Sequence, residues 1–180
     1  RPDWLDFDVV PGGVCLLTDD SSPLTNALAQ ALKARGWQVV VLSFPTSLFA
    51  ASNVADVPHI ALPDLSEDQL KSAVAQVTNE YGPIQAFIHL NPTHRLFTSN
   101  GKLFLQQEKS ILKSVFLLAK HLKVSLANQH VRTSFMTVAR LDGTLGVEQQ
   151  KGFSAIAGGL FGLTKALNLE WEMVHCRALD

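Results

Sequence analysis

Residues 14–43, VCLLTDDSSPLTNALAQALKARGWQVVVLS, decide the fold of this 180-residue chain. The apolar runs at 14–17 and 39–42 are typical of buried strands. Between them, apolar residues recur at the spacing of one helix face, and Gly36 follows the last of them. A strand, a helix and a strand in this order predict a βαβ unit, which opens a parallel sheet. The apolar residues of the helix face are Leu24, Ala27, Leu28, Ala31 and Leu32.

The turn between the first strand and the helix, TDDSSPLT at 18–25, lacks the glycines of a dinucleotide-binding loop. Such glycines let the backbone approach a pyrophosphate, whose charge is held by amides at the helix N-terminus. Asp19 and Asp20 bring negative charge to this place, and Pro23 has no amide proton. We therefore predict that Asp19, Asp20, Ser21 or Ser22 caps the helix. Two alternatives stay open: a divergent nucleotide loop, and a metal- or phosphate-sensing role for the acidic pair.

The rest of the chain alternates strands and helices, and it predicts an α/β fold. The pattern indicates a Rossmann-like, doubly wound parallel sheet with helices on both faces. Residues 1–13 are expected to form a linker or edge segment, and residues 14–180 one subdomain. The S-x-x-Q pattern at 66–69 predicts a capping box. Strands are expected at 59–62, 86–90, 133–139 and 176–179, and helices at 66–81, 103–126 and 158–171.

The helix expected at 103–126 carries more apolar residues than one buried stripe requires. Exposed apolar surface often marks an interface, so this helix is a candidate for self-association or for binding another domain. Its lysines favour a solvated face or, as an alternative, contact with an acidic carrier protein. The predicted core stripe is Leu112, Val115, Phe116, Ala119 and Leu122, and the spare apolar residues are Leu103, Leu105, Ile111, Leu117, Leu118 and Val124.

Composition and charge exclude several classes of function. The net charge of −1 argues against a broad nucleic-acid or membrane surface, and no apolar run is long enough to span a bilayer. Neither Cys15 nor Cys176 has the spacing of a zinc site, and both lie in expected strands, which indicates buried thiols in a reducing, cytoplasmic compartment. The six histidines show no metal-ligand spacing. The N-terminal stretch is not a signal peptide, and we interpret the chain as part of a longer polypeptide.

Over residues 14–180, about nine tenths of the chain, the order of landmarks resembles the short-chain dehydrogenase/reductase superfamily, and three segments carry the resemblance. They are LPDLSEDQL at 62–70, GPIQAFIHLNP at 82–92 and, most specifically, GGLFGLTKALNLEWEMVHCRALD at 158–180. The resemblance is strongest to the ketoreductase regions of modular polyketide synthases and of multifunctional polyunsaturated fatty acid synthases. Such regions resemble a duplicated Rossmann unit, in which one half is catalytic and the other is a truncated structural half.

The resemblance places the family's cofactor-binding pattern on residues that do not fit it. The glycine loop TGGxGxLG falls on 18–25, and neither the Arg nor the Asp that selects NADP or NAD follows the second strand. Phe44 is expected to pack inward there, and His89 to be a hydrogen-bonded core residue rather than a catalyst. Leu90 and Pro92 replace smaller residues and would narrow a nicotinamide pocket. The degenerate loop positions are Asp19, Asp20, Ser22, Pro23 and Thr25.

The family's catalytic positions are also degenerate. The resemblance implies a Tyr that protonates the ketone oxygen, a Lys about four residues later and a Ser about thirteen residues earlier. These positions hold Phe153, Ala157 and Arg140, so the proton relay is absent.

The leading hypothesis is a non-catalytic structural half that binds no cofactor and supports an NADPH-dependent sister half, which reduces β-ketoacyl groups on acyl carrier protein. The alternatives are a divergent active NADP-dependent ketoreductase and a carrier-protein docking module.

Overall fold

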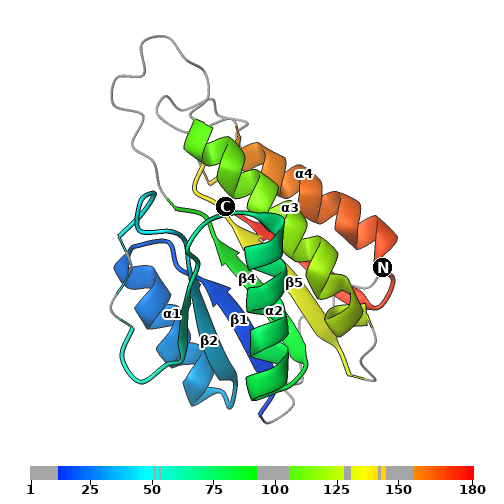
Figure 1. Cartoon of the computed structure of the whole chain (residues 1–180). Coiled ribbons are helices and arrows are strands. Elements are labelled where there is room, and N and C mark those ends of the chain that lie inside the picture. The colour runs from blue at the N-terminus through cyan, green and yellow to red at the C-terminus, as the bar shows by residue number, and fades with distance from the viewer. Residues whose placement is uncertain are drawn as a thin grey trace.

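The computed structural model describes residues 12–50, 52, 54–92, 106–127, 131–141, 143–144 and 156–180. Within them, six parallel strands form one sheet in the order β3-β2-β1-β4-β5-β6, which confirms the expected Rossmann-like α/β class (Figure 1). The predicted linker at 1–13 lies mostly outside the described residues. The strands are β1 (Val14–Thr18), β2 (Gln38–Ser43), β3 (His59–Ala61), β4 (Ile84–Leu90), β5 (Thr133–Val138) and β6 (Val174–Leu179), and the helices are α1 (Pro23–Ala34), α2 (Glu67–Tyr81), α3 (Gln106–Ala127) and α4 (Ala157–Glu170).

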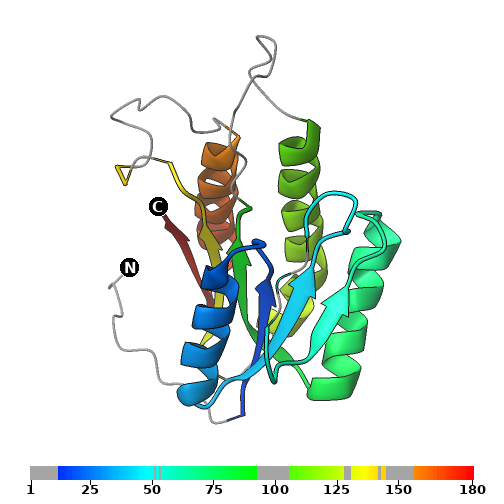
Figure 2. The same ribbon diagram turned by 90° about the vertical axis from the view of Figure 1, so that its left-hand side faces the viewer.

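Helices cover both faces of the sheet (Figure 2), and a separate core of buried side chains lies on each face. Residues of β1 alternate between them: Leu16 faces the core under α2, α3 and α4, whereas Leu17 faces the smaller core under α1. Alternation of this kind follows from the two-residue period of a strand. Because both faces of β1 are covered, all five of its residues are buried.

The parallel neighbours β1 and β4 lie at the switch point of the sheet: the chain adds β2 and β3 on one side of β1, and then β4, β5 and β6 on the other side. In open parallel sheets, the crevice at the carboxyl ends of the strands at such a switch point is where ligands bind. The turn after β1 and the segment after β4 meet there, so the fold brings the degenerate loop at 18–25 beside His89 and Asn91.

The prediction of the core stripe on the long helix is partly wrong. Phe116 is 57% exposed, whereas Leu117 and Leu118 are buried. Helix α3 packs against β4 and β5 and is flanked by α2 and α4, so its buried arc is wider than one stripe. Ile111 is likewise buried, and Val124 is exposed as expected. Leu103 and Leu105 lie outside the described residues.

Two local predictions on the other helices also need correction. Ser66 is the N-cap of α2, but its hydroxyl makes no capping hydrogen bond, so the capping box is not formed. Instead, the Ser66 amide donates to Asp64 Oδ1 at 2.8 Å. On α4, helical spacing predicts that Leu163 and Leu167 are both core residues. Leu167 is buried, but Leu163 is only partly buried because it faces outward beside α3. None of the helices in the described part of the chain is both long and apolar enough to cross a membrane.

Candidate functional site

The N-terminus of α1 is capped by the side chains of its own turn. Ser22 is the N-cap, and its Oγ accepts a hydrogen bond from the Leu24 amide at 3.2 Å. Pro23 occupies the first helical position, where a missing amide proton costs little. The predicted capping by serine is therefore confirmed.

Asp19 is the centre of the turn, and its carboxylate is nearly completely buried. Its Oδ1 accepts from the Ser21 amide at 2.8 Å and from the Ser52 hydroxyl at 2.5 Å. Its Oδ2 accepts from the Ser52 amide at 2.6 Å and from the Ser43 hydroxyl at 3.0 Å. Backbone amides before a helix are the groups that bind a phosphate there, and here the Asp19 side chain accepts the hydrogen bond of one of them, the Ser21 amide.

The Asp20 carboxylate also accepts hydrogen bonds near the N-terminus of α1. Its Oδ1 accepts from the Ser22 amide at 3.0 Å and from the Thr25 hydroxyl at 2.7 Å. The Arg140 guanidinium lies 3.9 Å from Asp20 Oδ2. Arg140 is thus brought from the end of β5 to the turn after β1. Two carboxylates and a guanidinium therefore occupy the turn at 18–25, where the resemblance places the family's cofactor loop.

The electrostatics of the turn favour the ionised form of Asp19. Burial by itself raises the pKa of this carboxyl group, but the hydrogen bonds from Ser52, Ser21 and Ser43 outweigh it and hold the pKa below the usual value. Asp19 is therefore charged at neutral pH, and a phosphate brought to the same amides would be repelled.

The chain between β2 and β3 folds back along α1. The Ser21 hydroxyl donates to the Ala50 carbonyl oxygen at 2.5 Å, and the Gln30 side-chain amide donates to the Ala55 carbonyl oxygen at 2.9 Å. Lys33 Nζ donates to the Asp56 carbonyl oxygen at 2.7 Å. These contacts and those of Ser52 fasten the β2–β3 connection to the first turn and along the side of α1.

His89 lies in the core at the end of β4, as the sequence predicted. Its Nδ1 lies 2.9 Å from the hydroxyl of Thr18, which also accepts from the Leu90 amide. Phe44, buried as expected, packs edge-on against the His89 ring. Burial lowers the pKa of His89 to about 4, so this side chain is neutral at pH 7. Its Nε2 is buried without a hydrogen-bond partner among the described residues.

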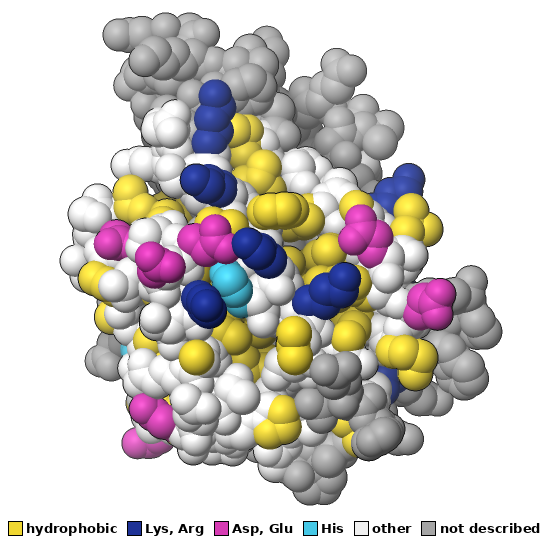
Figure 3. Space-filling model, turned by 45° about the vertical axis from the view of Figure 1, so that its right-hand side comes forward, with side chains coloured by type: hydrophobic (Ala, Val, Ile, Leu, Met, Phe, Trp, Pro, Cys, Tyr) yellow, Lys and Arg dark blue, Asp and Glu magenta, His cyan; other side chains and the backbone are white. Residues whose placement is uncertain are grey.

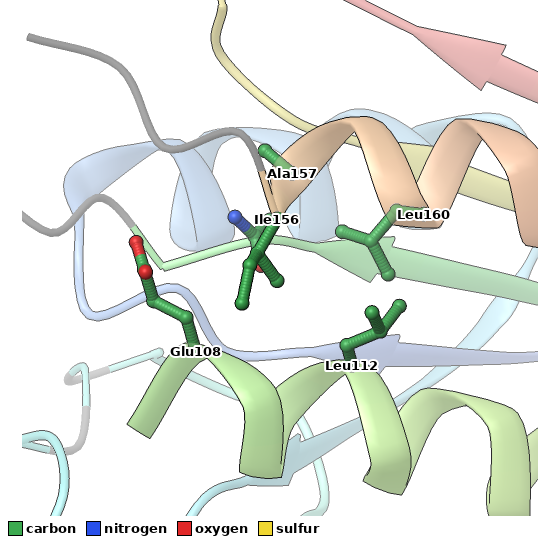
Figure 4. Close-up of a pocket in the computed structure, with 6 residues that line it drawn as sticks. Glu108, Leu112, Ile156, Ala157 and Leu160 are labelled. Atoms are coloured by element: carbon green, nitrogen blue, oxygen red, sulfur yellow. The ribbon is translucent and has the colours of Figure 1, made fainter. Parts of the chain in front are cut away.

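The position that corresponds to the family's lysine, Ala157, is the first residue of α4 and is buried. It lines a cavity of about 10 Å³, which is room for a single water molecule. Figure 4 shows Leu112 of α3 and Leu160 of α4 pointing toward one another across this cavity, with Glu108 at its other end. Phe153, at the family's tyrosine position, lies outside the described residues.

Sequence reasoning missed Ser52 and Ser43 as partners of Asp19. Ser43 ends β2, and Ser52 lies in the following connection, so neither is near Asp19 in the sequence. The run of polar residues after β1 indicates a cap, but no local pattern indicates which distant donor completes it. The ion pair between Arg140 and Asp20 likewise joins residues that are distant in the sequence and that only the tertiary structure brings together. Among the described residues, no cluster of His, Cys, Asp or Glu is arranged to hold a metal ion.

Solved structures with the same architecture identify the fold. Aldohexose dehydrogenase from Thermoplasma acidophilum superposes with a TM-score of 0.74 at 18% identity, over 93% of this chain and 65% of that one. A short-chain dehydrogenase/reductase from Serratia marcescens gives a TM-score of 0.68 at 16% identity, over 93% of this chain and 77% of that one.

The fold is that of the short-chain dehydrogenases/reductases.

At the level of sequence, no protein-family model matches the chain. The chain is 33% identical, over 96% of its length, to one of the subunits of the polyunsaturated fatty acid synthase from a Thraustochytrium species. It spans only 6% of the length of that relative. The chain, which has the short-chain dehydrogenase/reductase fold, is therefore similar in sequence to one segment of a much larger synthase polypeptide.

Proposed function

We propose that this chain is the non-catalytic structural half of a ketoreductase region in a multifunctional fatty acid or polyketide synthase. In this role it binds no cofactor. It supports a sister half of the same polypeptide, which uses NADPH to reduce β-keto groups carried on acyl carrier protein. The similarity to a segment of a polyunsaturated fatty acid synthase supports the synthase context.

The observation that carries the proposal is the pair of carboxylates at the N-terminus of α1. Asp19 and Asp20 accept the hydrogen bonds of the Ser21 and Ser22 amides. A dinucleotide would have to displace both carboxylates from these donors and would bring its own negative charge beside them. Coulomb repulsion at such short range is strong even near a protein surface, so this turn disfavours a pyrophosphate.

The alternative of a divergent active reductase has less support from the described residues. Reduction of a ketone needs a proton donor and a group that lowers the pKa of that donor. Ala157 offers no charge, and the cavity beside it is far smaller than a ligand pocket, which occupies roughly 300–1,000 Å³.

The proposed partners follow from the same role. The sister half is the principal partner, because a supporting domain acts through the interface that it forms. Acyl carrier protein is a second candidate, and self-association through the helix at 103–126 is a third. Nucleic acid and membrane are not among the proposed partners. A cytoplasmic location fits Cys15 and Cys176, which are buried and form no disulfide.

An isothermal titration of NADPH into the 180-residue chain tests the central claim. We expect no binding with a Kd below about 10 μM, or roughly −7 kcal/mol. The Asp19→Gly/Asp20→Gly variant, checked for folding by circular dichroism, is the matched comparison because it removes both carboxylates. Tight binding by the unmodified chain would overturn the proposal. Binding gained only by the variant would identify the carboxylates as the groups that exclude the cofactor.

A further inference from the structure

An open apolar groove lies on the outer side of α3 and α4, away from the crevice at the end of β1. It has a volume of about 440 Å³. Phe116 stands in it with 57% of its surface exposed, although the next two residues of α3 are buried. The groove is lined by Lys109, Leu112, Lys113, Phe116, Gly159 and Leu163.

Close contact between the two helices shapes the floor of this groove. A Cβ atom added at Gly159 would lie 2.8 Å from Leu112 Cδ2, so the glycine lets the Leu112 side chain lie against α4. Leu163 of α4 is only partly buried beside it. Elsewhere on the same two helices, Val124 of α3 and Leu169 of α4 are also exposed, at 69% and 76%. Exposed apolar surface bordered by charge is typical of an interaction site.

Among the described residues, the two charged side chains that line the groove are both lysines, whereas the wider surface of α3 includes the ion pair of Lys120 with Glu67 of α2. The only acidic residue of α3, Glu108, is buried, whereas every lysine of this helix is exposed. Within the described part of the chain, no acidic side chain lines the groove. Figure 3 shows lysine side chains bordering the apolar surface over these helices. The exposed lysines are Lys109, Lys113, Lys120 and Lys123 on α3, joined by Lys165 on α4, and Lys120 contacts Glu67 at 2.6 Å.

This charge distinguishes between possible occupants. A second copy bound by two-fold symmetry would place the same patch against itself, so lysines around Phe116 would face lysines of the other copy. A helix with an apolar face and acidic flanks would instead fill the groove and pair with the lysines. Packing of an amphipathic helix into an apolar groove is a common mode of recognition.

We propose that the groove between α3 and α4 binds an acidic amphipathic helix of a partner protein. Phe116, Leu112 and Leu163 contact the apolar face of that helix, and Lys113 pairs with its acidic flank. The inference does not depend on whether the crevice at the end of β1 binds a cofactor, because none of the residues at the N-terminus of α1 lines the groove.

Two labelled synthetic helices test the proposal by fluorescence anisotropy with the 180-residue chain. Each has about 18 residues, or roughly 27 Å, and the same leucine face, but one has glutamate flanks and the other lysine flanks. We expect the acidic helix to bind at least about tenfold more tightly, with an affinity that falls as salt screens the charges. Lys113→Glu should reverse the preference, and Phe116→Ala should weaken binding of either helix about tenfold.

Matched controls change similar side chains elsewhere. Lys71→Glu alters an exposed lysine of α2 outside the groove, and Leu24→Ala alters a partly exposed leucine of α1 on the other face of the sheet. Neither should affect binding, and circular dichroism should show that all variants are folded. Equal binding of the two helices, equal effects of Lys71→Glu and Lys113→Glu, or no binding below about 1 mM would overturn the proposal. So would dimerisation in sedimentation experiments that Phe116→Ala abolishes, since a second copy would then be the occupant.

Discussion

The crevice at the end of β1 and the groove between α3 and α4 have opposite characters. In the crevice, the polar groups at the start of α1 are satisfied by Asp19 and Asp20, and the cavity at Ala157 holds about 10 Å³. In the groove, Phe116 is exposed beside a volume of about 440 Å³. The chain therefore supplies its own side chains where a short-chain dehydrogenase/reductase fold has its switch point, and it leaves apolar surface uncovered on the outer helices.

The two regions show that a fold and its ligand site can be stabilised by separate interactions. The sheet and its two cores need only the apolar residues of the strands and helices. The first turn of α1 needs an acceptor for its amides, and a carboxylate from the same chain meets that need as well as a phosphate does. A domain with such a turn keeps its architecture and is free to act through another surface.

The largest expected effect concerns the core beneath the groove. Leu118→Ala should destabilise the protein by about 2–5 kcal/mol, because a fully buried leucine leaves a cavity when truncated. Urea unfolding followed by circular dichroism measures the change. A loss below about 1 kcal/mol would be typical of a surface position, and it would remove the distinction between Leu118 and the groove residues.

The second effect concerns the crevice. Asp19→Ala should cost about 1–3 kcal/mol, because it leaves the Ser52 amide and other buried donors without an acceptor. Ser52→Ala, which removes only a hydroxyl, should cost less, and the double variant should show that the two effects are not additive. Fully additive losses would mean that the short Asp19–Ser52 contacts contribute no coupling energy.

A third and smaller effect is the pH dependence of the same turn. The pKa of Asp19 is lower in the folded protein than its usual value, so its ionisation stabilises the fold above that usual value, about 3.9. This contribution is lost as the pH falls through the folded pKa. Between about pH 5 and about pH 2.5, the unmodified protein should therefore lose more unfolding free energy than Asp19→Asn does. Equal losses of unfolding free energy for the unmodified protein and for Asp19→Asn, measured by urea unfolding at the two pH values, would contradict this assignment.

The smallest expected effect is that of Phe116→Ala on stability. Because the ring is 57% exposed in the groove, its removal should change the free energy of unfolding by less than about 0.5 kcal/mol. Thermal unfolding at several protein concentrations measures it. A loss comparable to that of Leu118→Ala would mean that Phe116 is covered in solution, and the groove would no longer contrast with the crevice.

Much of the fold could be predicted because the relevant signals are local. Apolar runs and helical spacing predicted each strand and helix to within a few residues, and the polar run at 19–22 predicted that one of its side chains caps α1, as Ser22 does. The predictions for α3 failed at Phe116 and Leu117 because helical spacing gives the centre of a buried face but not its width. That width depends on how many elements surround the helix, and here the sheet, α2 and α4 all contact it.

The residue types in the first turn set which chemistry that turn can offer. With Asp19, Asp20 and Pro23 at the N-terminus of α1, the turn carries charge and lacks glycine whatever its surroundings. Only the tertiary structure decided what these residues contact. Ser52 and Arg140 reach the turn because the β2–β3 connection and the end of β5 converge there. The physical reason is that residue type is a local property, whereas hydrogen-bond partners and exposure are set by distant segments that the sheet brings together.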